Sequence, residues 1–226
     1  PNVELIVSLK PDLVIGVDLQ AKVVKTLESL GVTAIALKSE TISDVFSSII
    51  LVGKATGATG EAKNLTSAIQ ERIKKVWMKT SGVENKTRVA HIVWLNPIMV
   101  AGKKRYINDV IEYAGGENSF KDVDQSYPVI NPEAMIERQP DVIIVSGHAY
   151  PGKSPEEVLE YLESVPGWNE LRAIKNGRVY VLMGEAEDVL VRPGPRVSMA
   201  IELVAKILYP VCFGVTPTKV ITSPDL

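Results

Sequence analysis

A short run of cations in the middle of the chain has the residue types and placement expected of an anion-binding loop. Lys103, Lys104 and Arg105 follow a glycine at the point where a helix is predicted to begin. Cations at a helix N-terminus oppose the helix dipole, so helix stability does not explain their position. A bound anion would explain it, because unpaired backbone N–H groups at that terminus attract negative charge. Trp94 and Tyr106 flank the run and supply either a flat apolar wall or core packing.

A second basic pair, Arg192 and Arg196, surrounds a stiff Pro-Gly-Pro segment. Pro195 suits the first position of a helix, which predicts both arginines near a helix N-terminus. Their guanidinium groups match carboxylate or phosphate oxygens, or alternatively bind loop carbonyls. His148 follows a predicted strand and is a candidate ligand contact, whereas His91 lies inside a strand pattern and is predicted to be structural.

Several classes of function are disfavoured by the sequence. It contains no Walker A loop, nucleophile elbow or His-Glu-x-x-His motif. Two histidines and the single Cys212 are too few for a three-histidine or cysteine-based zinc site. The formal net charge of −2 gives no reason to expect nucleic-acid binding. We therefore expect neither catalysis, nor a directly bound metal ion, nor a cofactor.

The elements that would position these residues include one unit that occurs twice. Residues 5–16 and 134–145 each contain an amphipathic stretch, a Pro-Asp pair and an apolar run. Pro11 and Pro140 stop the helices, and the apolar runs suit strands covered on both faces of a parallel sheet. Two such units predict two similar α/β lobes with a cleft between them.

The longest predicted element is a helix over residues 59–80, which would reach roughly 33 Å and could cross between the lobes. The predicted fold class is therefore α/β, with two Rossmann-like lobes of mainly parallel strands bridged by one long helix. The predicted divisions are an incomplete N-terminal lobe (1–58), a bridging helix (59–82) and a C-terminal lobe (83–226). The other predicted helices are 3–9, 20–30, 42–55, 104–113, 132–139, 155–163 and 195–208, and the strands are 12–17, 32–37, 88–94, 142–146 and 178–183.

Stretches spread along the chain resemble the class III periplasmic substrate-binding proteins of ABC importers, which bind ferric siderophores, haem and cobalamin. The resemblance rests on residues 9–16, 30–32, 101–102, 111–118, 131–133, 139–145, 174–180 and 192–196. It implies that the ligand is held between the lobes and delivered to the membrane permease. It also implies a periplasmic or extracellular location, with a lipid anchor on an N-terminal segment absent from this chain. Family members carry a further strand–helix–strand stretch before the point that corresponds to Pro1, so the first lobe is expected to be incomplete.

The resemblance also implies a set of binding residues along the cleft walls, which correspond to residues 17–19, 94–106, 127, 147–150 and 192–196. The predicted ligand contacts are Trp94, Asn96, Met99, Lys103, Arg105, Tyr106, Tyr127, His148, Tyr150, Arg192 and Arg196. In the family, a glutamate on each lobe meets arginines of the permease. Glu156 or Glu157 takes this place in the second lobe, and Asp18 stands in the first lobe where no glutamate occurs. A further acidic group, Glu185, Glu187 and Asp188, is read either as a solvated surface or as a contact for a basic partner.

The ligand and the function class have alternatives. The two basic loops favour an anionic ferric siderophore by charge complementarity. Trp94, Tyr106, Tyr127 and Tyr150 would equally suit a corrinoid or haem. An enzyme on the related nitrogenase-component-like architecture would need cluster-ligating cysteines, and only Cys212 is present. A sensory or adaptor domain that keeps the fold without the ligand is a third alternative.

Overall fold

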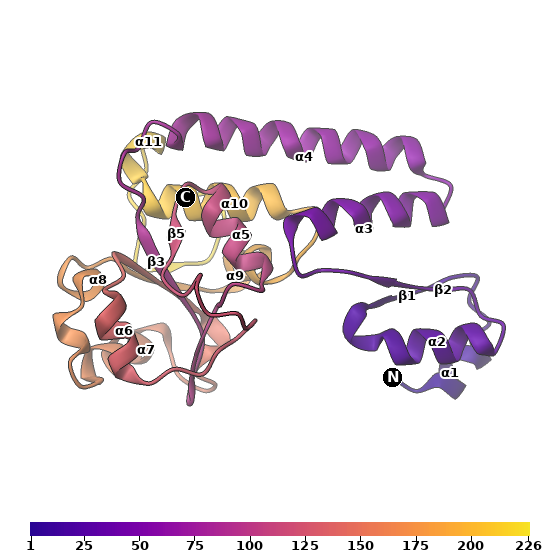
Figure 1. Ribbon diagram of the computed structural model, residues 1–226, viewed down its shortest axis with the longest axis horizontal. Helices are drawn as coiled ribbons and strands as arrows, with labels where there is room; N and C mark the ends of the chain where they lie inside the picture. The colour runs from indigo at the N-terminus through magenta and orange to yellow at the C-terminus, as the bar shows by residue number, and fades with distance from the viewer.

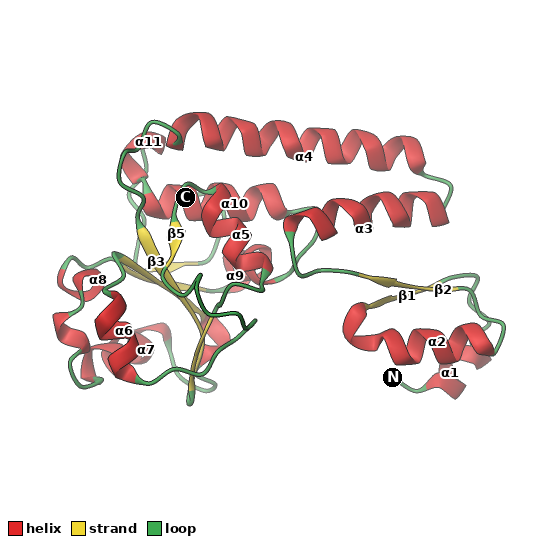
Figure 2. Cartoon of the chain, in the orientation of Figure 1, coloured by secondary structure: helices red, strands yellow, loops and turns green.

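The computed structural model describes residues 1–226 as an α/β chain in which helices alternate with mainly parallel strands. This confirms the predicted fold class. The strands, yellow in Figure 2, form two separate sheets, a two-stranded one near the N-terminus and a six-stranded one in the C-terminal part. No helix combines the length and apolar character that crossing a bilayer requires.

The N-terminal unit is a small β–α–β arrangement with an extra leading helix. It comprises α1 (Val3–Ser8), β1 (Val14–Val17), the 3-10 turn η1 (Asp18–Gln20), α2 (Ala21–Ser29) and β2 (Ala34–Leu37). The two strands pair in parallel, with Val14 opposite Ala34. Its apolar core contains only three buried side chains, those of Val24, Leu27 and Ala34. Figure 1 shows this unit set apart from the remainder and joined to it by the segment between β2 and α3.

Two long helices follow as a packed antiparallel pair (Figure 1). α3 (Ile42–Ala55) and α4 (Thr59–Thr80) have the bounds predicted from the sequence. Thr41 begins α3 with a capping box, since its hydroxyl accepts the Asp44 N–H at 3.1 Å and the Asp44 carboxylate accepts the Thr41 N–H at 3.0 Å. Apolar residues of α3 and α4 join the same buried cluster as α10 (Val197–Leu208) of the C-terminal part. The division at residues 58 and 82 stays a prediction.

The C-terminal sheet has the strand order β4-β3-β6-β7-β8, with β5 pairing beside β4 on β3. Its strands are β3 (Arg88–Leu95), β4 (Ile98–Val100), β5 (Glu117–Asn118), β6 (Val142–Ser146), β7 (Val179–Leu182) and β8 (Val220–Ile221). All pairs are parallel except β3 with β4. The apolar cluster on one face includes α5 (Tyr106–Tyr113), α9 (Gly184–Val191) and α10. The cluster on the other includes α6 (Pro132–Arg138), α7 (Pro155–Ser164) and α8 (Arg172–Lys175). The short α11 (Pro210–Phe213) follows α10.

The repeated sequence unit forms the same local structure twice. α1 leads into β1, and α6 leads into β6, as the pattern predicts. The residue before the proline has a positive φ in both copies, 48° at Lys10 and 43° at Gln139. This left-handed residue ends the helix, and Pro11 and Pro140 prevent it from resuming.

Two predicted helix starts are wrong by two residues, and several short elements were not predicted. The helix expected from residue 104 begins at Tyr106, because Arg105 is extended and the Lys104 N–H bonds to the Gln125 carbonyl. The helix expected from residue 195 begins at Val197. The elements β4, β5, α8, α9, α11 and β8 were not predicted; most span only two to four residues, too few to show a hydrophobic period.

Candidate functional site

Several candidate binding residues of the C-terminal part lie at or just after the ends of strands along one edge of the sheet. β3, β6 and β7 are parallel neighbours that end at Leu95, Ser146 and Leu182. The carboxyl edge is where open α/β sheets bind ligands, because the loops that follow the strands converge there. The candidate side chains form two groups, one in β3, β4 and the loops beside β4, and the other around α9.

The first group begins with the turn between β3 and β4. The Trp94 indole N–H donates to the Asn96 carbonyl oxygen at 2.8 Å, which ties the ring to the turn. Met99 is the register partner of Trp94 across the two strands. Trp94 and Met99 are half-buried and Asn96 is exposed. The three predicted contacts therefore share one hairpin with an accessible apolar side.

Arg105 and Tyr127 form the centre of the first group, although 22 residues separate them in the chain. The Arg105 guanidinium lies 4.3 Å from the centroid of the Tyr127 ring, and its Nη2 donates to the phenol oxygen at 2.8 Å. A phenol does not neutralise the cation, so the full positive charge remains for a ligand. Lys103 is exposed beside this pair. Lys104 instead binds Asp124 at 2.9 Å, and this hydrogen bond holds the pKa of the Asp124 carboxyl below its usual range.

Tyr106 packs in the core, which is the second of the two roles that its position in the sequence allows. Its side chain is 2% exposed and belongs to the buried cluster with α10. Burial raises its pKa, and its hydroxyl has no hydrogen-bond partner. We therefore leave Tyr106 out of the proposed ligand contacts.

The second group is organised by α9, whose carboxylates each bind a predicted ligand contact. Asp188 binds Arg192 at 3.0 Å and Glu185 binds Arg196 at 3.4 Å. Glu187 accepts from the ring of His148 and also from its backbone N–H at 3.2 Å. The acidic group that the sequence left unassigned is thus the set of internal partners for the basic residues of this edge. No hydrogen bond or ion pair joins this group to Arg105 or Lys103.

Tyr150 lies outside both groups. It is half-buried and its ring packs edge-on against Tyr161, with centroids 5.1 Å apart and an angle of 68° between the rings. Tyr161 lies in the second half of α7, the helix that carries Glu156 and Glu157, which are predicted to meet the permease.

The three predicted docking carboxylates differ in how free they are. Glu156 is exposed. Glu157 forms an ion pair of 2.8 Å with Lys153 and a capping box with Ser154. The hydrogen bond from Lys153, and to a smaller degree that from the Ser154 backbone, lowers the pKa of Glu157. Asp18 is half-buried and accepts the Leu19 N–H at 2.9 Å. Glu156 is therefore the carboxylate most available to an external arginine.

His91 is structural in its surroundings, as its strand pattern predicts. It is 1% exposed and its Nε2 lies 3.1 Å from the Ser146 hydroxyl, while Nδ1 has no partner. Burial, with a smaller contribution from the charge of His148, lowers its pKa to about 3. The imidazole is therefore neutral at physiological pH and adds no charge to the carboxyl edge.

An apolar cavity of about 520 Å³ lies between the N-terminal unit and the α3–α4 pair. The loop between Arg192 and Arg196 forms one wall, so the cavity adjoins the second group of cations. No local sequence pattern predicts this cavity, since its lining comes from five separate segments. These are the ends of β1 and β2 at Val17 and Leu37, the α3 face at Val45, Ile49 and Val52, the α4 start at Ala62 and Leu65, and residues 193–195.

Comparisons with known proteins agree with this architecture. The sequence model of the family described as "Periplasmic binding protein" matches residues 1–186. An uncharacterized ABC transporter substrate-binding lipoprotein of Bacillus subtilis, YvrC, is 27% identical over 94% of this chain and 66% of its own length. The vitamin B12-binding protein of Vibrio parahaemolyticus is 28% identical over 88% of this chain and 69% of its own.

Two further proteins extend the comparison. The high-affinity heme uptake system protein IsdE of Staphylococcus aureus is 26% identical over 80% of this chain and 63% of its own length. A crystal structure described as a possible iron-binding (periplasmic solute-binding) protein of Staphylococcus epidermidis has a TM-score of 0.79 at 28% identity, covering 92% of this chain and 80% of that one. The chain thus spans about two thirds of the curated relatives' length. Because the family model matches more than half of the chain, this protein belongs to the periplasmic binding protein family.

Proposed function

We propose that the chain is the ligand-capturing part of a solute-binding protein that serves an ABC importer and binds an iron chelate of the ferric-siderophore class. The observation that carries this proposal is the Arg105–Tyr127 pair, with the exposed Lys103 two residues before the arginine, in the loops beside β4. A flat ring and an unneutralised cation suit an anionic chelate with planar aromatic or hydroxamate groups. The role is capture and release, without catalysis.

A tetrapyrrole ligand is the second candidate, and two observations favour it. The cavity of about 520 Å³ is mostly apolar and falls in the size range of small-molecule pockets. Two of the relatives are described as binding vitamin B12 or as a heme uptake protein. A haem or corrinoid would place its ring against this apolar wall and its propionates or amides toward Arg192 and Arg196.

The partners follow from the same proposal. The permease of the importer would receive the loaded protein through Glu156 on α7, with Glu157 and Asp18 as weaker contacts. The protein would work outside the cytoplasm, in the periplasm or at the cell surface. Lipid anchoring through a further N-terminal segment has a precedent in the lipoprotein YvrC.

Titration with a ligand panel tests the proposal. Ferric catecholate and hydroxamate siderophores, haem and cobalamin are each added while tryptophan fluorescence is followed. Trp94 is the useful reporter, because Trp168 is fully buried and the exposed Trp77 can be replaced by phenylalanine. The expected result is saturable quenching by ferric chelates at micromolar concentration or below.

Matched variants assign the signal to the site. Arg105→Ala is expected to weaken chelate binding at least tenfold, whereas Arg72→Ala, an exposed arginine on α4, is expected to leave it unchanged. Binding of haem or cobalamin that depends on Arg192 rather than Arg105 would favour the second candidate. If no member of the panel binds, the importer assignment fails and the adaptor alternative remains.

A further inference from the structure

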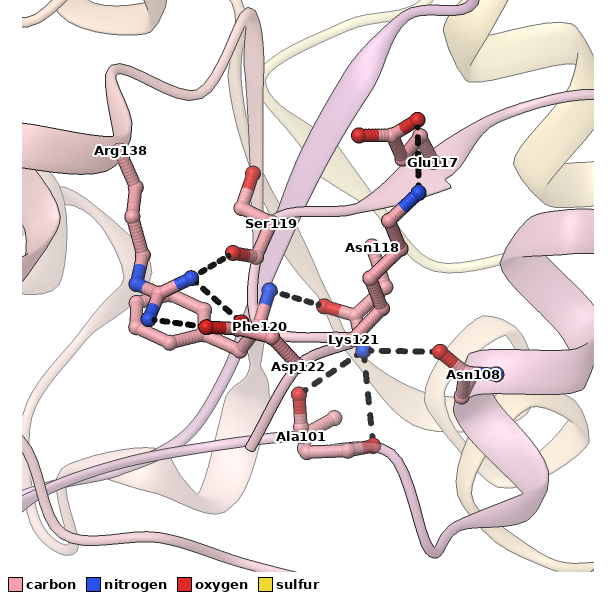
Figure 3. Close-up of polar contacts among 10 residues, drawn as sticks. Ala101, Asn108, Glu117, Asn118, Ser119, Phe120, Lys121, Asp122 and Arg138 are labelled. Carbon is pink, nitrogen blue, oxygen red and sulfur yellow. Dashed lines mark hydrogen bonds and ion pairs between the residues drawn. The ribbon is translucent and has the colours of Figure 1, made fainter. Parts of the chain in front are cut away.

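Asn118, the last residue of β5, connects the two loops that carry Arg105 and Tyr127, residues 101–105 and 119–127. It is 1% exposed, and both polar atoms of its side chain are engaged (Figure 3). Its Nδ2 donates to the Ala101 carbonyl at 3.1 Å and to Asn108 Oδ1 at 3.2 Å, with the Gly102 carbonyl at 3.4 Å. Its Oδ1 accepts the Phe120 N–H at 3.0 Å. One side chain therefore binds the loop before the basic run, the helix after it and the loop that leads to the tyrosine.

The two loops are also bonded directly to each other. The Gly102 N–H donates to the Ser126 carbonyl at 3.0 Å, and the Lys103 N–H donates to the Val123 carbonyl at 3.0 Å. The first loop delivers the ligand-facing arginine and the second delivers its tyrosine partner. Their relative position is thus fixed by backbone bonds, one of them made by Gly102, whose carbonyl also accepts from Asn118.

A second contact fixes the loop that leads from Asn118 to Tyr127, just after Asn118. Arg138 donates to the Ser119 carbonyl at 2.7 Å and forms a two-point ion pair with Asp122 at 2.6 and 3.0 Å (Figure 3). Its guanidinium carbon also lies 4.6 Å from the centroid of the Phe120 ring. Paired hydrogen bonds of this kind set direction as well as distance.

The sheet anchors the whole arrangement. Asn118 is the register partner of Val89 on β3, and the Ser119 N–H donates to the Val89 carbonyl at 2.8 Å. A site held by a strand is positioned more accurately than one held only by loops. The Asn118 side chain transmits that position to both loops.

We propose that Asn118 is a positioning residue for the binding surface. It holds the Arg105–Tyr127 pair in the geometry that an anionic ligand needs, and it does not itself contact the ligand. This inference rests on the proposed function and deepens it. Part of the ligand affinity of the site would then depend on the buried side-chain amide of Asn118, which is not on the binding surface.

A double-mutant cycle tests the proposal. Asn118→Ala is expected to weaken binding of a ferric hydroxamate chelate by about tenfold, because the carbonyls it held lose their donors and the loop shifts. In an Arg105→Ala background the same change is expected to cost almost nothing further, because Asn118 acts through Arg105. Ser119→Ala is the control, since the Ser119 hydroxyl is buried beside Asn118 without a hydrogen-bond partner. Equal losses in the two backgrounds would overturn the proposal.

Hydrogen exchange tests the positioning role of Asn118 without a ligand, and so independently of the proposed function. In Asn118→Ala, peptides covering residues 99–106 and 119–127 are expected to exchange about tenfold faster, while residues 142–146 of β6 keep their protection. This result supports the positioning role even if no chelate binds the unchanged protein. Unchanged exchange in both peptides overturns it. Should Asn118→Ala fail to fold, Asn108→Ala keeps the bonds to Ala101 and Gly102 and is expected to show the same pattern at smaller amplitude.

Discussion

Gly102 lies so close to Gln125 that a β-carbon on Gly102 would be 2.2 Å from the Gln125 carbonyl oxygen. The obstructing atom is backbone and cannot swing aside as the end of a long side chain would. Gly102→Ala is therefore expected to destabilise the fold by about 1–3 kcal/mol and to weaken chelate binding. Urea unfolding and ligand titration measure the two effects. Gly82→Ala, where no atom lies within 4 Å of the added carbon, is the control, and equal stability of both variants would contradict the argument.

The carboxylates of α9 are expected to compete with an anionic ligand for the cations that they hold. Glu185→Gln releases Arg196, so binding of an anionic chelate that reaches this arginine should tighten by about two- to fivefold, as expected for a partly exposed pair. The gain should shrink between about 50 mM and 500 mM salt because screening weakens both interactions. Glu163→Gln on α7 changes the net charge equally and should not change affinity. Equal tightening by both variants would point to overall charge instead.

Acid is expected to destabilise the protein through His91. The pKa of this imidazole is about 3 in the folded state and 6.5 in the unfolded state. Between these pH values the unfolded chain binds a proton that the folded chain does not bind. Stability is complete above pH 6.5 and falls as the pH drops toward 3, by up to about 1.4 kcal/mol per pH unit. Urea unfolding of the wild type and of His91→Gln between pH 7.5 and 4.5 measures the difference. The variant should show a flatter dependence, and parallel curves would remove His91 as the cause.

The elements that could be predicted from the sequence are those whose signals are local. α3 and α4 have their predicted bounds because Thr41 and Asp44 cap the first, and Gly57, with a positive φ of 78°, separates the two. The strands β1 and β6 follow from the Pro-Asp pairs that precede them. In each case the deciding residues lie within a few positions of the element they fix.

Two contacts of the site could not be predicted, because they join residues that only the fold brings together. Glu187 and His148 are 39 residues apart, and Arg105 and Tyr127 are 22 apart. The acidic residues at 185–188 have the composition of a solvated surface. Asp188 has a local partner, Arg192, four residues on, but Glu187 and Glu185 bind His148 and Arg196, which lie 39 and 11 residues away. Tyr106 illustrates the opposite case, since the residues just before it are exposed or half-buried cations while its own ring is in the core.

Close packing of α3 on α4 at Gly53 gives a further prediction, which compares substitutions at two glycines, Gly53 and Gly60. A β-carbon on Gly53 would lie 2.4 Å from the Ala62 β-carbon, so Gly53→Ala is expected to cost about 1–3 kcal/mol. Gly60, inside α4, has no atom within 4 Å of the added carbon, and Gly60→Ala should stabilise by up to about 1 kcal/mol. Adding Ala62→Gly to Gly53→Ala should restore part of the loss by removing the clashing atom, which a double-mutant cycle on thermal unfolding measures. If Ala62→Gly adds its own full cost instead, the helices do not meet at these two residues.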